Sequence, residues 1–528
     1  MFSVLDLQLG FSDAENYRRR ENKELLNRLF IRNQHLDRLC EPAISFLIGE
    51  KGTGKTAYAV YLANNNYKDT FSSLRYIRET EYQKFLSLKR EKQLTLSDYA
   101  SIWKVIILVL MSQQVKDREG GPEFLRRFTK MNAVQGAIDD YYSNAFAPEI
   151  VQVLQFVEES KLSAELLSKY AKLGGESKES FSFSESRFQT NLFYIQRQFE
   201  AALSQLRLDS NHVLFIDGID IRPESIPFKE YLECIKGLAN AVWEVNNDFF
   251  PSVKGKGRMR VVLLVRPDIF QSLGLQNQNT KSRDNSVFLD WRTEYLNHRG
   301  SDLFRVTDHL LGSQQSRVLK LGEAWDHYFP WNAPNVFDKY DTFTSFIAFL
   351  RWSYYRPRDI VTILVILQNI AREKGGRGKP SFSWEDFDSP DFQRRYSDYL
   401  LGEIKDHLIF YYGLPEYEAF LKFFEFLKGR NTFDYLFYLE AFKKFKGSIE
   451  LTKIGVPQFM TSADVFLQFL YDLNVVCYRE RPQDDKPYVR WCFRERSYGN
   501  ISPKVKSSVE YQVFYGLAKA LNVGKQFA

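Results

Sequence analysis

The chain has little cysteine, and what it has is dispersed. The four cysteines show neither metal-ligand spacing nor the density of a disulfide scaffold: Cys40, Cys234, Cys477 and Cys492. The six histidines are also scattered, and none has an evident metal partner. We therefore expect reduced thiols in a cytoplasmic protein, without a cysteine- or histidine-based metal site.

Long hydrophobic runs are missing as well. The N-terminus carries Asp6, Asp13 and Glu15 where a signal peptide has an apolar core. The most apolar window, residues 102–111, contains Lys104 and is too short to span a bilayer. These features predict no membrane association. No protease, nuclease, deaminase or glycosidase constellation stands out.

Charge of either sign is in small excess only. The 72 basic and 66 acidic residues leave a net charge of +6, which permits contact with nucleic acid or acidic protein but does not require it. Aromatic residues are abundant, with 45 Phe and 30 Tyr, and predict helix packing rich in aromatic contacts. A length of 528 residues exceeds one compact core and predicts roughly two to four domains.

A glycine-rich motif follows the first apolar strand, residues 44–48, and precedes a helical pattern. It reads Gly49, Glu50, Lys51, Gly52, Thr53, Gly54, Lys55, Thr56, Ala57. This is the phosphate-binding loop, or Walker A pattern, whose backbone amides and helix N-terminus form a cradle for phosphate oxygens. It predicts ATP binding, with Lys55 on the β- and γ-phosphates and the Thr56 hydroxyl on Mg²⁺.

A second buried strand, residues 213–216, ends in Asp217, the Walker B position, which predicts a ligand for Mg²⁺ or its water. Gly218 follows, where many ATPases have a glutamate that polarises the attacking water. Asp220 and Glu224 are the nearest substitutes, and we favour Asp220. The alternative role for Asp220 is to cap a helix beginning near Pro223.

The third strand, residues 261–265, ends in Arg266, which we expect to sense the γ-phosphate, or else to form a surface or interface salt bridge. A polar loop, residues 276–286, precedes the last core strand, residues 287–291. Its Arg283 is a candidate arginine finger for a neighbouring copy, the alternative being a solvated loop arginine.

Together these motifs resemble the AAA+/STAND branch of P-loop NTPases, especially NACHT- and KAP-like members. Asp217-Gly218-Ile219-Asp220 and Arg266-Pro267 match its Walker B and sensor patterns, although Ile221 stands where NACHT proteins have glutamate. Arg356-Pro357-Arg358-Asp359 resembles the sensor 2 motif, which implies that Arg358 folds over the phosphates from a lid helix. The chain further resembles uncharacterised bacterial FunZ-like P-loop ATPases, which makes antiviral defence with a separate effector an expectation.

The expected fold class is α/β. A P-loop NTPase core with a parallel sheet flanked by helices occupies residues 1–300 and contains N-terminal helices and a helical insertion at about 87–206. A helical lid, 301–378, and a C-terminal helical and winged-helix-like domain, 379–528, follow. Two strands are expected at 475–481 and 488–496, and a final helix at 509–521.

The predicted C-terminal hairpin is rich in arginine: Arg479, Arg481, Arg490, Arg494 and Arg496. These side chains could contact DNA or RNA phosphates, or dock on protein, and we favour docking. The leading hypothesis is a Mg-ATP-dependent switch or sensor, active as a homo-oligomer or with an effector. The alternatives are a DNA-dependent motor or loader, and a nucleotide-bound scaffold with little turnover.

Overall fold

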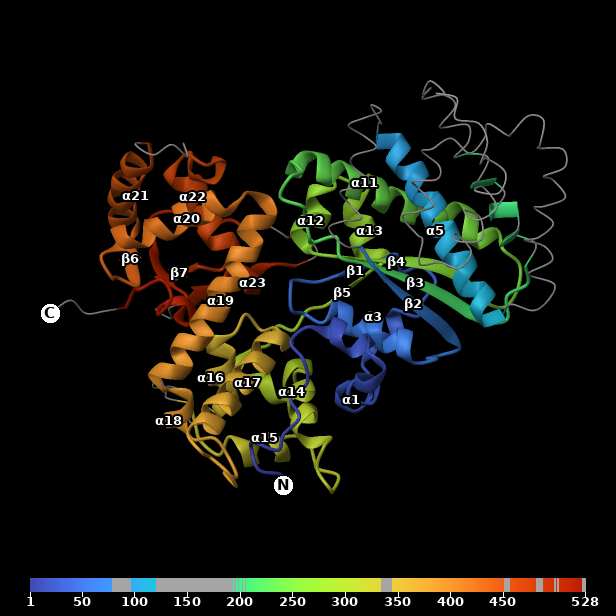
Figure 1. Cartoon of the computed structure of the whole chain (residues 1–528). Helices are drawn as coiled ribbons and strands as arrows, with labels where there is room; N and C mark the ends of the chain where they lie inside the picture. Colours follow the sequence, from blue (N-terminus) through green and yellow to red (C-terminus); the bar gives the residue numbers. More distant parts are fainter. Residues whose placement is uncertain are drawn as a thin grey trace, which may run out of the picture. The chain divides into compact units, whose positions relative to one another are not determined.

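The computed structural model describes residues 1–77, 96–119, 206–333, 344–450, 456–480, 488–497 and 503–524, with isolated positions at 193–204 and 500. Most of the expected insertion, and Arg481, lie outside these residues. The described chain forms two compact units (Figure 1). The core unit is Asn33–Gly49 and Lys55–Leu289. The second unit, called the C-terminal unit below, is Met1–Arg32, Glu50–Gly54 and Asp290–Ala528.

A five-stranded parallel sheet forms the centre of the core unit, with strand order β2-β3-β4-β1-β5. Its strands are β1 (Phe46–Ile48), β2 (Thr70–Tyr76), β3 (Asn211–Asp217), β4 (Met259–Val265) and β5 (Ser286–Phe288). Strands β1 and β4 are buried along their whole length, as is usual for parallel strands covered on both faces. The expected parallel sheet flanked by helices is therefore confirmed.

Helices cover both faces of this sheet (Figure 1). One face carries α3 (Lys55–Asn64). The other carries α5 (Leu96–Glu119), α11 (Phe228–Glu244), α12 (Pro267–Ser272) and α13 (Gln278–Asp284). Helices α5 and α11 approach closely at Gly237, where an added Cβ would lie 2.5 Å from the Cβ of Tyr99. A glycine is therefore required for this contact.

Helices make up most of the C-terminal unit. They are α1 (Lys23–Leu29), α14 (Asp302–Gly312), α15 (Glu323–Tyr328), α16 (Ser345–Trp352), α17 (Pro357–Glu373), α18 (Trp384–Phe387), α19 (Pro390–Tyr411), α20 (Leu414–Phe423), α21 (Tyr435–Glu450), α22 (Ala463–Asp472) and α23 (Cys492–Glu495). Aromatic rings fill the core between α15 and α16, where Trp325 stacks on Phe329 and meets Phe346 edge to face. Gln368 of α17 holds the N-terminal segment by donating to the carbonyl oxygens of Val4 and Leu7.

The C-terminal unit also contains a four-stranded antiparallel sheet with strand order β6-β9-β7-β8. Its strands are β6 (Thr432–Asp434), β7 (Val476–Glu480), β8 (Tyr488–Arg490) and β9 (Glu510–Val513). The prediction of a helix at 509–521 is wrong. The beginning of this stretch forms β9, which pairs with β6 on one side and β7 on the other. Hydrogen bonding to two neighbouring strands decides the conformation here, although the apolar residues of this stretch have helical spacing. The strand expected at 488–496 also ends early, since α23 begins at Cys492.

None of the described helices combines the length and apolar character needed to cross a membrane. The cysteines are free thiols: Cys234, Cys477 and Cys492 are buried, and Cys40 is half-buried.

Candidate nucleotide-binding site

The loop between β1 and α3 has the backbone of a tight phosphate-binding turn. Gly52 and Gly54 both have positive φ, +87° and +97°, which residues with a side chain rarely adopt. Gly49 and the stretch from Lys55 belong to the core unit, whereas Glu50–Gly54 belong to the C-terminal unit.

In the core unit, the first turn of α3 meets the end of β3. The Thr56 hydroxyl donates to Asp217 Oδ2 at 2.6 Å, across 161 residues of sequence. The buried Lys55 ammonium donates to the Gly49 carbonyl oxygen at 2.8 Å. Ala57 follows in the same turn of α3. An ammonium, a hydroxyl and a carboxylate thus converge where a P-loop protein binds the phosphates and Mg²⁺.

Asp217 is fully buried. Burial, and then the charge of Asp220, raise the pKa of Asp217 to about 6, although the Thr56 hydroxyl and the Lys55 charge oppose the rise. The Gly218 amide donates to its other carboxylate oxygen at 2.8 Å. Above that pKa, a buried carboxylate next to a hydroxyl is well suited to bind a hard divalent cation. Among the described residues, no group of three or more His, Cys, Asp and Glu forms a metal site by itself.

Gly218 stands where many ATPases place a glutamate, and the structure gives a steric reason for glycine at this position. Its φ is +88°, and an added Cβ would lie 2.3 Å from the Ile77 carbonyl oxygen at the end of β2. Ile77 in turn donates its amide to the Asp217 carbonyl oxygen at 2.9 Å. No side chain fits at this position without moving β2.

Asp220 lies close enough to Asp217 to raise its pKa. It does not cap α11, which begins at Phe228 with Pro227 in the N-cap position. Asp220 is half-buried. It is therefore the acid that the structure brings beside Asp217.

The two candidate site arginines of the core unit, Arg266 and Arg283, have carboxylate partners. Arg266, buried at the end of β4, pairs with Asp268, with 3.1 Å between Nε and Oδ1. This salt bridge is buried and lies within the chain, so it is neither the surface nor the interface pair of the alternative, and the role of Arg266 as a γ-phosphate sensor stays a prediction. Arg283, in the last turn of α13, has a side chain that is 73% exposed, and it pairs with its neighbour Asp284 at 3.0 Å.

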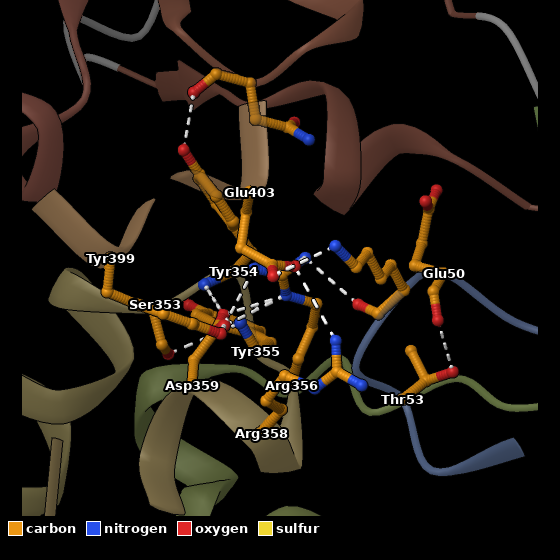
Figure 2. Close-up of polar contacts among 12 residues, drawn as sticks. Glu50, Thr53, Ser353, Tyr354, Tyr355, Arg356, Arg358, Asp359, Tyr399 and Glu403 are labelled. Carbon is orange, nitrogen blue, oxygen red and sulfur yellow. Dashed lines mark hydrogen bonds and ion pairs between the residues drawn. The ribbon is translucent and has the colours of Figure 1, made fainter. Parts of the chain in front are cut away.

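In the C-terminal unit, the first turn of α17 contacts the middle of the loop (Figure 2). Arg356 forms a two-pronged ion pair with the buried Asp359 and donates Nη1 to the Lys51 carbonyl oxygen at 3.0 Å. Arg358, the expected sensor 2 residue, packs against Gly52 and donates Nε to the Ser12 carbonyl oxygen at 3.0 Å. Of the two arginines, Arg356 is the one with a side-chain hydrogen bond to the loop.

Two loop side chains form ion pairs with residues much further along the chain. Lys51 pairs with Glu403 at 3.2 Å and Asp406 at 2.6 Å, both on α19. Glu50 pairs with Arg496, directly after α23. The charges of Arg356, Lys51 and Arg358 keep the pKa of Glu403 below its usual range despite its burial.

The described arginines of the expected hairpin each have a partner within the chain. Arg479 pairs with Glu510, Arg490 with Glu480, Arg494 with the Tyr295 hydroxyl, and Arg496 with Glu50. These contacts favour the docking interpretation over binding of nucleic acid phosphates.

Several residues at this loop were missed from the sequence, namely Asp359, Glu403, Arg496 and Trp291. Asp359 had a signal, because it completes the Arg-Pro-Arg-Asp motif. Arg496 was singled out only as one arginine of the hairpin expected to dock on protein, without Glu50 as its partner. Glu403 had no signal, since it is one charge among many on α19, and only long-range folding brings it to Lys51. Comparison with family models, curated proteins and solved structures finds no match to this chain.

Proposed function

We propose that this chain binds Mg-ATP between the loop Gly49–Thr56 and Asp217, and that it acts as a nucleotide-dependent switch. The contact between Thr56 and Asp217 carries the proposal, because this hydroxyl and carboxylate are the pair that would hold Mg²⁺. When bound, Mg²⁺ would neutralise charge on the β- and γ-phosphate oxygens. Lys55 would bind the same oxygens, and Asp220 would accept a proton from the attacking water.

The sheet order supports an AAA+/STAND-like ATPase in particular. Strand β4, which ends in Arg266, lies between β1 with the phosphate loop and β3 with Asp217. In such a sheet the strand ends bring a sensor residue beside the nucleotide. Helices α20 to α22, followed by the paired strands β7 and β8, support a winged-helix-like C-terminal module, although α23 shortens the second strand of the expected hairpin.

A switch is favoured over a motor because loop residues are ion-paired with the end of the chain. Glu50 and Lys51 lie directly beside the phosphates in a loop of this kind, and their partners Arg496 and Glu403 come from the C-terminal helices. Nucleotide binding would thereby change contacts of the C-terminal unit. A role in antiviral defence with a separate effector rests on the FunZ-like resemblance alone.

The test is calorimetric titration of the full chain with ATP at millimolar Mg²⁺, beside Lys55→Ala. The wild type is expected to release binding heat and Lys55→Ala to release none, because the variant lacks the ammonium on the phosphates. Absence of heat from folded wild-type protein would contradict the proposal. A slow-turnover scaffold remains the second candidate, since glycine occupies position 218.

Mass measurement with a non-hydrolysable ATP analogue separates the switch from the motor. We expect ATP-dependent homo-oligomers, with the exposed Arg283 acting on a neighbouring copy. Turnover that rises strongly with added DNA, without change of mass, would favour the motor instead.

A further inference from the structure

Three consecutive carbonyl groups of the loop accept hydrogen bonds from the C-terminal unit. Arg356 Nη1 donates to Lys51 O at 3.0 Å, the Arg358 amide to Gly52 O at 3.2 Å, and Trp291 Nε1 to Thr53 O at 2.9 Å. Arg356 is the N-cap residue of α17 and Arg358 lies in its first turn, whereas Trp291 lies near the start of the segment Asp290–Ala528. The three bonds fix the orientation of three successive peptide planes.

In a trans peptide the carbonyl group and the following N–H point in opposite directions. The described chain has no cis peptide bond, so the amides of Gly52, Thr53 and Gly54 point away from the three donors. The Thr53 amide is used inside the loop, where it donates to Glu50 O at 3.2 Å. The amides of Gly52 and Gly54 thus point to the side opposite the donors on their peptide carbonyls, and a backbone cradle for phosphate is built from loop amides of this kind.

The two side-chain donors are themselves held rigidly. Trp291 is 7% exposed. Arg356 is held by Asp359, which also accepts hydrogen bonds from the Tyr399 hydroxyl at 3.0 Å and the Tyr354 amide at 2.9 Å (Figure 2). Groups locked by packing and by further hydrogen bonds position a site more accurately than mobile ones do.

We propose that Trp291 and Arg356 are positioning residues that assemble the phosphate-binding loop before nucleotide arrives. This inference deepens the proposed function and rests on it. Neither side chain touches the phosphates in this role, and each acts through a loop carbonyl. Without them, nucleotide binding would have to order the peptide planes at an entropic cost.

The test compares Trp291→Phe with Trp325→Phe, in the full chain. Each change keeps an aromatic ring and removes one indole N–H. The two tryptophans differ in their acceptors, because Trp291 donates to the loop carbonyl of Thr53, whereas the buried Trp325 donates to the Ser345 hydroxyl at 2.9 Å. We expect Trp291→Phe to weaken Mg-ATP binding about tenfold and Trp325→Phe to leave it unchanged. Arg356→Lys, which keeps the charge but has a single ammonium in place of the fork, should weaken binding similarly.

A second measurement needs no nucleotide. Hydrogen exchange of a peptide covering residues 50–54 should become several-fold faster in Trp291→Phe and stay unchanged in Trp325→Phe. Wild-type affinity together with wild-type exchange in Trp291→Phe would overturn the positioning role, as would equal losses of affinity in both tryptophan variants. If wild-type protein binds no ATP, the proposed function fails, whereas the exchange experiment still decides whether Trp291 orders the loop.

Discussion

Arg496 forms an ion pair with Glu50, a residue 446 positions earlier in the chain and the second residue of the phosphate-binding loop. Its other terminal nitrogen donates to the Asp472 carbonyl oxygen, at the end of α22, at 2.8 Å. One guanidinium thus joins the loop to the C-terminal helices. It also neutralises the Glu50 carboxylate within the Walker A motif.

This pairing predicts a charge effect on nucleotide affinity. Arg496→Gln leaves Glu50 without its cation, so we expect Mg-ATP binding to weaken about threefold to fivefold through repulsion, as is reasonable for a partly exposed ion pair. Glu50→Gln in the same chain should restore the affinity. Titration calorimetry of the four members of this mutant cycle is the measurement. An equal loss in the double variant would show that charge is not the cause.

Asp220 is predicted to act in hydrolysis and not in binding. Asp220→Asn removes the proton acceptor, so we expect turnover to fall about a hundredfold, with the dissociation constant of Mg-ATP nearly unchanged. Glu224→Gln is the matched control, because Glu224 is the exposed carboxylate four positions further on. Phosphate release and calorimetry provide the two readouts. Unchanged turnover in Asp220→Asn would remove Asp220 from the mechanism.

Asp359 is predicted to be essential for the stability of the C-terminal unit. Its carboxylate is fully buried and neutralises Arg356, so Asp359→Asn would remove the nearer counter-charge of a buried guanidinium and leave it with Glu403 at 3.9 Å. We expect the free energy of unfolding to fall by about 3 kcal/mol in urea titrations. Asp391→Asn, at the half-exposed pair with Arg395, should be nearly neutral. A similar small change in both variants would contradict this role.

The burial of the His298 ring predicts that the stability of the fold depends on pH. Its Nδ1 lies 2.6 Å from the Tyr295 carbonyl oxygen, and its Nε2 lies 2.8 Å from the Thr344 hydroxyl, which suits a neutral ring with the proton on Nδ1. Burial lowers the pKa of His298 below its usual value of 6.5. The folded state therefore binds a proton less readily than the unfolded state, and His298 favours unfolding as the pH falls below about 6.5.

We accordingly expect the urea midpoint of the wild type to fall between pH 7 and pH 5. The fall should be smaller in His298→Gln, because glutamine does not titrate. Comparison of the two slopes removes the contribution of all other titrating groups. Parallel slopes would show that His298 does not contribute.

Local sequence was sufficient to predict those features that depend on neighbouring residues alone. The glycine pattern from Gly49 to Gly54 specifies a turn that needs positive φ, and the apolar runs ending in Asp217 and Arg266 specify buried parallel strands. Prediction from local sequence was wrong at residues 509–521, where the apolar spacing suggested a helix. Pairing with two neighbouring strands decides the conformation of β9 in this stretch. Such pairing depends on residues far away in the chain.

The sequence by itself determined the phosphate-binding motif, the acid that closes the second long strand, and a parallel sheet covered by helices, because spacing and side-chain type carry that information. Only the tertiary structure decided that Gly218 lies against Ile77, that Arg356 and Trp291 hold loop carbonyls, and that Arg496 reaches Glu50. These contacts join segments distant in the chain. Their partners are selected by packing, which no local pattern encodes.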